Sequence, residues 1–254
     1  MLSDAIMVDV SSDWMAACKV QQRFMRCLGP RRMDSTTDVF DVSAQCRQVR
    51  ELGGDFYDFV PFPERRLTLA VGDASGKGLA AALMISNVQS SLRTAALFTG
   101  DNTAKAIEAV NRQVYGSSLA ERYATLFYGV FDGHTRILRY VNAGHPPPMV
   151  VRRDGSVTWL ENGGVPVGMF SDWTYEEGIV QLNPGEMVLA CTDGVLEAVS
   201  LAGEEWGEEG LRTAASEGAT KCADEIVNTV FSSMDKFSQG RQTDDATVVV
   251  LRIH

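Results

Sequence analysis

The residues best suited to chemistry in this chain are aspartates that stand beside glycines or polar turns. They occur in four short motifs: Gly54-Asp55, Gly72-Asp73, Thr192-Asp193-Gly194 and Thr243-Asp244-Asp245. Three of these motifs lie at the edge of an apolar run, so their aspartates can stand at strand ends, where backbone approaches a ligand closely. Carboxylates that share a small volume repel one another unless positive charge is added. Their oxygens suit hard divalent cations, so the motifs predict a metal site if folding brings them together.

Other glycine-containing motifs have simpler interpretations. Asp132-Gly133 and Asp154-Gly155 are typical turn dipeptides and are interpreted as turns. The segment Gly72–Gly78 resembles a nucleotide phosphate loop, because a glycine precedes Lys77 just before a predicted helix. Its spacing excludes that function, since Gly72 to Gly76 is one residue short and Gly78 stands where a serine or threonine must coordinate magnesium. Lys77 is predicted to lie in solvent or, as the less favoured alternative, near a substrate.

Composition limits the possible partners and location. The net charge is -10, from 33 acidic and 23 basic residues, and no basic block interrupts the acidic balance, which argues against a nucleic-acid or anionic-membrane surface. No apolar stretch approaches the roughly 20 residues that cross a bilayer, and the acidic N-terminal region lacks a signal-peptide pattern. The chain is therefore predicted to be cytoplasmic. Its five cysteines contain no CxxC pair, which favours reduced and mostly buried thiols.

The N-terminal region carries a separate helical pattern. Residues 13–28 place Trp14, Cys18, Met25 and Leu28 on one seam with Gln21, and Gly29-Pro30 ends the pattern. Two heptads are too short for a stable isolated coiled coil, so the seam must pack on its own domain, on a second copy or on an upstream region. Residues 1–30 are therefore predicted to be a regulatory or linker segment, which could support a homodimer, and residues 31–254 are predicted to be one domain.

The remaining residues alternate between strand and helix patterns. Strands are predicted within residues 38–49, 56–60 and 67–71, and helices at 79–97 and 103–119, with Asn102 as an N-cap. Further strands are predicted at 124–131, 137–141, 149–152, 157–160, 174–181 and 187–191, followed by a helix at 222–237 and a strand at 246–253. The short connections between the middle strands leave no room for crossover helices, which predicts a largely antiparallel α+β domain.

Five motifs in a fixed order carry a family resemblance. They are Glu51-Leu-Gly-Gly-Asp-Phe-Tyr-Asp58, Val71-Gly-Asp-Ala-Ser-Gly-Lys-Gly78, Tyr140-Val-Asn-Ala-Gly-His-Pro146, Cys191-Thr-Asp-Gly194 and Gln242-Thr-Asp-Asp-Ala-Thr247. From about residue 20 to its end, the chain resembles the bacterial SpoIIE/RsbU branch of the metal-dependent type 2C (PPM) serine/threonine phosphatases. The resemblance implies a four-layer αββα sandwich of two mainly antiparallel sheets flanked by helix pairs. It also implies two Mn²⁺ or Mg²⁺ ions at one edge of the sheets.

The resemblance also implies roles for individual residues. The implied catalytic residues are Asp73, Asp193 and Asp244, and the implied metal ligands are Asp55, Asp73, Ala74, Asp193, Asp244 and Asp245. Asp73 would bridge both ions, with the carbonyl of Ala74 beside it. Neighbouring residues of an extended chain point to opposite faces, so Asp244 is expected to point inward and Asp245 to act in a supporting role. Asp58 is a weaker candidate, and no organic cofactor is expected.

The implied function is hydrolysis of phosphoserine or phosphothreonine on a regulatory protein of the anti-sigma-factor antagonist type, within signal transduction or stress control. Two cations about 4 Å apart can lower the pKa of a bridging water, and the resulting hydroxide would attack phosphorus in line. Two alternatives remain open: a catalytically silent phosphoprotein-binding module of the same fold, and a metal hydrolase that acts on a small phosphate ester.

Several polar residues near the motifs receive lesser roles. His145 is expected to be structural, and Ser75 stands where the eukaryotic branch has a histidine. Arg47 and Arg50 lie near Asp55 in sequence and could bind phosphate, although a solvated role is favoured for both. Glu204, Glu205, Glu208 and Glu209 are interpreted as a solvated loop around Trp206-Gly207.

Overall fold

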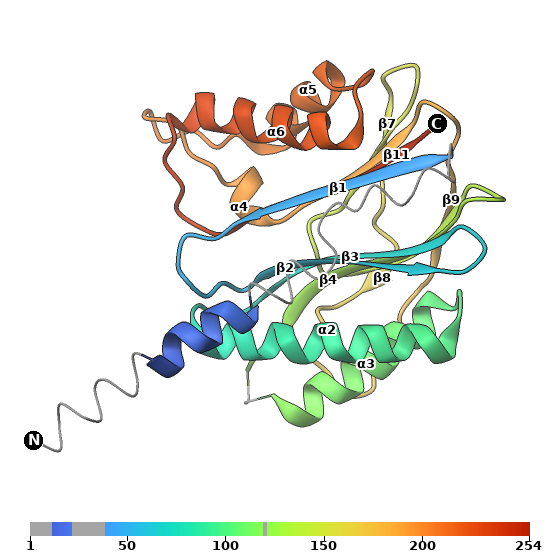
Figure 1. Cartoon of the computed structure of the whole chain (residues 1–254), viewed down its shortest axis with the longest axis vertical. Helices are drawn as coiled ribbons and strands as arrows, with labels where there is room; N and C mark the ends of the chain where they lie inside the picture. The colour runs from blue at the N-terminus through green and yellow to red at the C-terminus, as the bar shows by residue number, and fades with distance from the viewer. Residues whose placement is uncertain (1–11, 22–38, 119–120) are drawn as a thin grey trace, which may run out of the picture.

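Two β-sheets pack face to face between two layers of helices (Figure 1). This computed structural model describes residues 12–21, 39–118 and 121–254. One sheet has the order β1 (Phe40–Arg47), β11 (Ala246–Ile253), β10 (Met187–Cys191), β6 (Met149–Val151) and β7 (Val157–Trp159). The other has the order β2 (Asp55–Phe62), β3 (Arg66–Ala74), β4 (Ala124–Asp132), β5 (Ile137–Ala143) and β8 (Gly163–Gly164), and β9 (Gly178–Gln181) also pairs with β5.

Helix pairs cover the outer faces of the two sheets. The helices α2 (Leu79–Thr99) and α3 (Thr103–Ser117) lie against the β2–β5 sheet, and α5 (Gly207–Glu217) and α6 (Ala223–Ser238) lie against the β1–β11–β10 sheet (Figure 1). A short helix α4 (Asp193–Leu196) follows β10 directly. Asn102 caps α3 by accepting a hydrogen bond from the Lys105 backbone N–H at 3.0 Å. The α+β sandwich predicted from the sequence is confirmed.

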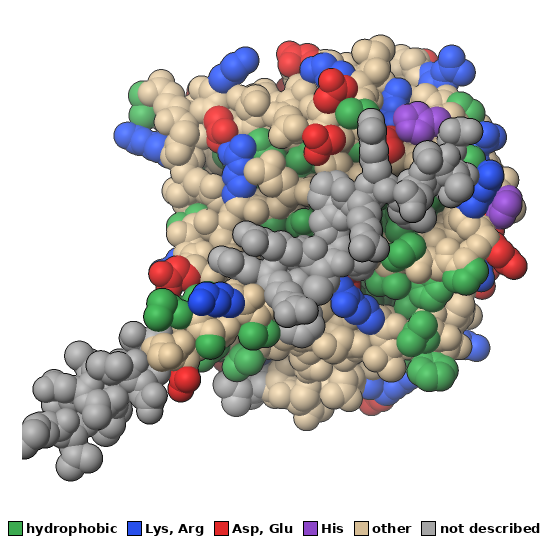
Figure 2. Space-filling model, in the orientation of Figure 1, with side chains coloured by type: hydrophobic (Ala, Val, Ile, Leu, Met, Phe, Trp, Pro, Cys, Tyr) green, Lys and Arg blue, Asp and Glu red, His purple; other side chains and the backbone are tan. Residues whose placement is uncertain are grey.

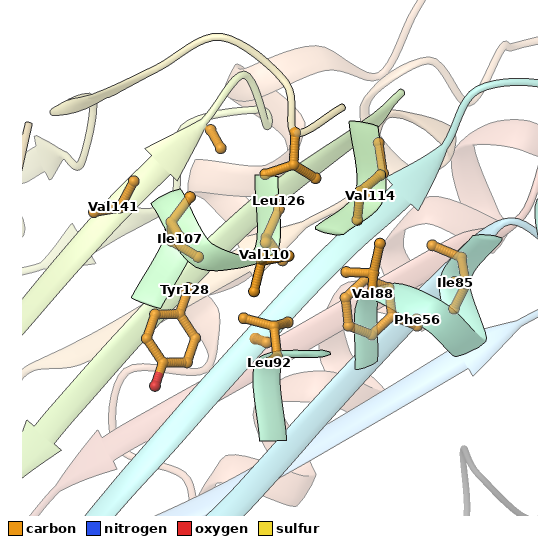
Figure 3. Close-up of a cluster of buried hydrophobic side chains, with 14 of the residues drawn as sticks. Phe56, Ile85, Val88, Leu92, Ile107, Val110, Val114, Leu126, Tyr128 and Val141 are labelled. Carbon is orange, nitrogen blue, oxygen red and sulfur yellow. The ribbon is translucent and has the colours of Figure 1, made fainter. Parts of the chain in front are cut away.

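Alternating apolar side chains produce the layered core. In β11, Val248 and Val250 pack toward α5 and α6, whereas Val249 and Leu251 pack between the two sheets. This two-residue period is the expected result of side chains that point to opposite faces of a strand. Figure 3 shows the corresponding cluster beneath α2 and α3, where Val88, Val110 and other labelled residues meet the β2–β5 sheet. Burying each such side chain contributes about 1.5–3 kcal/mol to folding.

Some sequence predictions were wrong in detail. Glu208 and Glu209 do not belong to a loop, because they form the first turn of α5, a helix that the sequence analysis did not predict. The spacing of Leu79 and Leu83 within the helix predicted at 79–97 places both on its apolar stripe. In the structure they are exposed at 44% and 63%, because Ala81, Ala82 and Ile85 supply the buried face of α2. The strand predicted at 174–181 is shorter, Gly178–Gln181, and β8 pairs parallel to β5.

The predicted N-terminal helix is present over residues 12–21 and lies beside α2 (Figure 1). Residues 22–28, with Met25 and Leu28, are outside the described residues, and so is the domain boundary predicted at residue 30. Hydrophobic side chains are exposed on and near this helix (Figure 2), among them Met15 at 57% and Val20 at 55%. In the part of the chain that the structure describes, no helix combines the length and apolar character needed to cross a bilayer.

The burial of the cysteines that the structure describes confirms the expectation of buried thiols in part. Cys18 and Cys191 are buried, Cys46 is partly buried and Cys222 is exposed. Burial, together with the nearby Asp55 carboxylate, raises the pKa of Cys46 far above its usual range, so this thiol stays protonated at neutral pH.

Candidate active site

Strand pairing brings the four aspartate motifs to one edge of the sandwich. Asp55 begins β2 and lies opposite Asp73 on β3. Asp193 follows β10, and Asp244 and Asp245 come just before β11. The strands β10 and β11 pair with each other in the other sheet. Thus one sheet supplies two of the carboxylates and the other sheet supplies the rest. The convergence predicted from the motifs is what the topology produces.

Asp55 connects the two sheets. Its Oδ2 atom accepts hydrogen bonds from the hydroxyls of Thr192 and Thr247, both at 2.7 Å. Thr192 precedes Asp193 and Thr247 lies on β11, so both hydroxyls come from the opposite sheet. Asp55 is 1% exposed, and this burial, reinforced by the Asp73 carboxylate, raises its pKa well above the usual range against the lowering effect of the two hydroxyls.

Asp73 stands where the acidic groups are most crowded. Burial raises its pKa to about 7, and the charges of Asp193, Asp244 and Asp245 act in the same direction. The opposing effect of a hydrogen bond from the Ala74 backbone N–H is smaller. Because neighbouring anions oppose the ionisation of Asp73, a cation bound beside it would strongly favour the ionised carboxylate.

Gly54 allows the β2 and β3 strand ends to approach closely. A Cβ atom at Gly54 would lie 2.7 Å from Oδ1 of Asp73 and 3.0 Å from the carbonyl oxygen of Ala74. The Ala74 backbone N–H donates to the Gly54 carbonyl at 3.1 Å, which holds the two segments together. Two oxygen donors, the Asp73 carboxylate and the Ala74 carbonyl, therefore share a small cradle that any side chain at position 54 would fill.

Asp193 lies at the first position of α4. Its Oδ1 atom accepts a hydrogen bond from the Gly194 backbone N–H at 2.8 Å, and burial, followed by the charge of Asp244, raises its pKa. A Cβ atom at Gly194 would lie 3.3 Å from Cβ of Asp244, and closer still to the Asp245 carbonyl oxygen. A glycine after Asp193 is therefore needed for this loop to approach the Asp244–Asp245 backbone.

Asp244 and Asp245 direct their carboxylates to different partners. Asp244 Oδ2 accepts a hydrogen bond from Lys77 Nζ at 2.7 Å. Asp245 accepts hydrogen bonds from two backbone N–H groups, those of Val49 at 2.8 Å and Gly54 at 3.0 Å. This division agrees with the expectation that adjacent residues face opposite ways, and it gives Asp245 contacts that suit a supporting role.

A small pocket opens beside these carboxylates. It has a volume of about 80 Å³ and is lined by Val49, Arg50, Leu52, Lys77, Gly78, Thr243, Asp244 and Asp245. Arg50 and Lys77 bring positive charge to a lining whose acidic members are Asp244 and Asp245. Lys77 is exposed, as predicted, and its ammonium group also forms an ion pair with Asp244.

The other candidates from the sequence have structural contacts. Arg47 forms an ion pair with Asp235 at 2.9 Å and lies 4.1 Å above the Phe231 ring, which ties β1 to α6. Asp58 forms a two-point ion pair with Arg93 of α2, at 2.7 and 3.0 Å. Both side chains are therefore engaged in ion pairs that join a strand to a helix.

His145 and Ser75 also take part in local structure. His145 is 3% exposed, its Nδ1 atom lies 3.1 Å from the Thr125 hydroxyl, and burial lowers its pKa to about 3, so the ring is neutral. The Asn142 side chain accepts from the His145 backbone N–H at 2.8 Å and donates to its carbonyl at 2.9 Å. The Ser75 hydroxyl accepts from the Tyr123 backbone N–H at 3.1 Å. The contacts of His145 agree with the structural role expected for it.

The donor set fits divalent cations in its chemistry and charge. In residues 12–21, 39–118 and 121–254, no three His, Cys, Asp or Glu side chains are closed around a single point in a way that would hold an ion. The carboxylates nevertheless share one sheet edge and raise one another's pKa values, and a backbone carbonyl lies in the same cradle. Oxygen donors of this kind favour Mg²⁺ or Mn²⁺ over softer metals.

Comparison with known proteins identifies the family. The family model for Stage II sporulation protein E (SpoIIE) matches residues 63–254. The chain belongs to the SpoIIE family. This family is the SpoIIE/RsbU branch of the PPM phosphatases, and membership places the chain among protein serine/threonine phosphatases, as the sequence predicted.

Curated relatives and solved structures agree with the assignment. "Phosphoserine phosphatase RsbU" of Bacillus subtilis is 27% identical over 248 residues, which cover 97% of this chain and 72% of RsbU. The match to "Phosphoserine phosphatase RsbP" of the same organism, also 27% identical, covers 63% of this chain and 40% of RsbP. The SiaA-PP2C domain of Pseudomonas aeruginosa has the same fold, with a TM-score of 0.80, 21% identity and coverage of 98% of this chain and 99% of that one.

A further structure contains an additional domain. The RsbU and RsbW domains of Rv1364c from Mycobacterium tuberculosis match with a TM-score of 0.71 and 25% identity, over 85% of this chain and 62% of that chain. The chain thus spans most of RsbU but less than two thirds of RsbP and of the Rv1364c structure.

Proposed function

We propose that the chain hydrolyses phosphoserine or phosphothreonine on a regulatory protein, with two Mn²⁺ or Mg²⁺ ions held at the aspartate edge. The observation that carries the proposal is the crowding of Asp73 by Asp193, Asp244 and Asp245 beside the Ala74 carbonyl. Family membership supports the same reaction class.

The metal ligands are proposed from the order of the motifs and their contacts. Asp73 would contact both ions, and the Ala74 carbonyl, Asp55, Asp193 and Asp244 would complete the protein ligands. Asp245, whose carboxylate accepts hydrogen bonds from the Val49 and Gly54 N–H groups, would hold the loop that carries Asp55. When bound, divalent cations would lower the pKa of a water molecule and offset the charge of a phosphate dianion.

The chain's own cations would orient the phosphate. Arg50 and Lys77 line the pocket beside Asp244, and a guanidinium can form two parallel hydrogen bonds to a phosphate group. Arg50 is the better candidate for a phosphate clamp, because Lys77 already donates to Asp244 and Arg47 to Asp235. No protein nucleophile is needed: the Ser75 hydroxyl accepts a backbone hydrogen bond, and His145 is buried and neutral.

The proposed substrate is a phosphorylated regulatory protein of the anti-sigma-factor antagonist type. Its support is similarity to RsbU and RsbP, both named phosphoserine phosphatases, and to a structure that contains RsbU and RsbW domains. A homodimer through the N-terminal helix is part of the proposal, and the exposed Met15 and Val20 supply apolar surface for it. The cytoplasmic location stays a prediction from the sequence.

The experiment that tests this function measures phosphate release from a phosphoserine-containing antagonist protein. Wild type, Asp73→Asn and Arg50→Ala are compared with added Mn²⁺ and after chelation. We expect wild-type turnover that requires metal, loss of at least ~100-fold in kcat for Asp73→Asn, and a raised KM for Arg50→Ala. Lys105→Ala, which removes an exposed cation on α3, serves as the control.

Three outcomes would contradict parts of the proposal. Full activity of Asp73→Asn would remove its assigned role. Binding of the phosphoprotein without turnover in wild type would favour the silent-module alternative, and faster hydrolysis of small phosphate esters than of the phosphoprotein would favour a metabolite phosphatase.

A further inference from the structure

Two buried threonines hold one oxygen of the Asp55 carboxylate. The hydroxyls of Thr192 and Thr247 both donate to Asp55 Oδ2 at 2.7 Å. Both threonines are 0% exposed and Asp55 is 1% exposed, so water does not compete for these hydrogen bonds. Distances this short are typical of hydroxyl groups that donate to an ionised carboxylate. The contact therefore suits a carboxylate that must keep one orientation.

The two threonines are also fixed relative to each other. The Thr247 backbone N–H donates to Thr192 Oγ1 at 2.9 Å, and the Thr192 backbone N–H donates to the Thr247 carbonyl at 3.1 Å. A threonine hydroxyl carries a single proton. Thr192 Oγ1 accepts from the backbone and directs its own proton to Asp55. Backbone hydrogen bonds of their own sheet thus hold the threonine pair, Thr192 and Thr247, in place against Asp55 on the opposite sheet.

The hydrogen bonds to Oδ2 limit how Asp55 can bind a cation. A carboxylate oxygen has two lone pairs, and the two hydroxyl donors occupy both of them on Oδ2. Among the residues that the structure describes, the hydrogen bonds to this carboxylate end on Oδ2, so Oδ1 is the oxygen that a cation would meet. Asp55 lies opposite Asp73 in the pairing of β2 with β3, which places the carboxylate at the aspartate edge.

We propose that Thr192 and Thr247 are positioning residues that make Asp55 a one-oxygen ligand. The small Mg²⁺ ion demands a near-octahedral arrangement of separate oxygens, whereas the larger Ca²⁺ ion takes more oxygens and often binds both oxygens of one carboxylate. Mn²⁺ also favours octahedral oxygen sites. The threonine pair thereby raises the preference of the site for Mn²⁺ or Mg²⁺ over Ca²⁺, although neither threonine is a ligand. This inference rests on the proposed metal-dependent function.

The test measures Mn²⁺ and Ca²⁺ binding separately, by isothermal titration calorimetry on the chelator-treated full chain. Thr247→Val removes one hydroxyl but keeps the branched shape that suits a strand. Thr247→Ser keeps the hydroxyl and tests for rescue. Thr68→Val is the matched control, because Thr68 is also buried, at 3% exposure, and its hydroxyl donates to the Val60 carbonyl at 3.4 Å. Thermal unfolding without metal shows whether each variant is folded.

We expect Thr247→Val to bind Mn²⁺ about tenfold more weakly than wild type, because removing a hydrogen bond that orients a metal ligand typically has an effect of this size. Its Ca²⁺ dissociation constant should change by less than about twofold, because the freed lone pair of Oδ2 becomes available to the larger ion. Thr247→Ser and Thr68→Val should bind both ions as wild type does. A threonine that merely stabilised the fold would weaken the binding of both ions by the same factor.

Failure of this inference and failure of the function give different results. Equal weakening of Mn²⁺ and Ca²⁺ binding, or wild-type Mn²⁺ binding, in folded Thr247→Val would overturn the positioning role alone. If Thr247→Val is unfolded, the same two titrations of Thr192→Val decide. A wild-type chain that binds the ions as expected but hydrolyses no phosphoserine would overturn the proposed function and leave the role of the threonine pair standing. A wild-type chain that binds no Mn²⁺ would overturn both.

Discussion

At the scale of single residues, the aspartate edge is an arrangement that costs stability. Asp55 is buried against two threonine hydroxyls, and Asp73 faces three further carboxylates. Lys77, which is bonded to Asp244, is the nearest compensating charge in the described part of the site. Such crowding persists in a fold when function selects it, because like charges at these separations destabilise the native state.

This crowding predicts a pH-dependent stability in the chelator-treated protein. The pKa of Asp73 is about 7 in the folded chain and near 3.8 when unfolded, so the folded state binds the proton more tightly. Its contribution to the unfolding free energy is therefore highest below about pH 4 and falls as the pH rises to about 7. Relative to wild type, Asp73→Asn should gain roughly 2–4 kcal/mol by pH 8 and little at pH 4.

Urea unfolding of both proteins across this pH range measures the difference. Asp132→Asn is a suitable control, because that aspartate lies at the far end of β4 and its pKa is lowered by hydrogen bonds from the backbone N–H groups of His134 and Thr135. A difference between wild type and Asp73→Asn that is constant with pH would contradict the assigned crowding.

Much of this site could be predicted from residue types, but its contacts could not. Glycine beside aspartate indicated strand ends, and the order of the motifs indicated the family. The hydrogen bonds from Thr192 and Thr247 to Asp55 join residues more than 130 positions apart. The pairing of β10 with β11 is what places the two threonines side by side. The threonines lie in or beside two of the motifs, which is the signal that sequence analysis did not use.

At the scale of elements, prediction followed the strength of the apolar pattern. The strand predicted at 246–253 is β11 with the same bounds, since its eight residues alternate between two buried faces. Helix α5 was missed because its buried face consists of Leu211, Ala214 and Ala215, behind a start rich in glycine and glutamate. The β8 strand is two glycines, which carry no periodic pattern at all.

The turn after β5 gives a prediction at this scale. Asn142 is 4% exposed, and its amide bonds to both backbone groups of His145 and to the Leu160 carbonyl at 3.3 Å. Asn142→Ala leaves these buried groups without partners, so we expect a loss of about 2–3 kcal/mol in unfolding free energy. Urea denaturation measures it, with Asn183→Ala, in the loop between β9 and β10, as a control. A change below about 0.5 kcal/mol would show that water replaces the amide.

At the scale of the whole molecule, the proposed metal ligands come from both sheets. Asp55 and Asp73 belong to the β2–β5 sheet, and Asp193 and Asp244 flank β10 and β11 of the other sheet. An ion held between them would connect the two halves of the sandwich, beyond the core residues that pack between the sheets. Metal binding and global unfolding are then linked, because the unfolded chain cannot gather these ligands.

This linkage predicts that Mn²⁺ and Asp73→Asn each stabilise the protein, but not together. Mn²⁺ at 100 times its dissociation constant should stabilise wild type by about 2.7 kcal/mol, which raises Tm by roughly 5–10 °C in a domain of this size. Asp73→Asn should melt higher than wild type without metal, because one repelling charge is gone, yet gain little from Mn²⁺, because a ligand is gone as well. Differential scanning calorimetry at pH 8 measures all four states. The expected pattern requires the Asp73 carboxylate to be both a source of the repulsion and a ligand of the ion. An equal Mn²⁺-induced rise in the Tm of both proteins would therefore place the ion elsewhere.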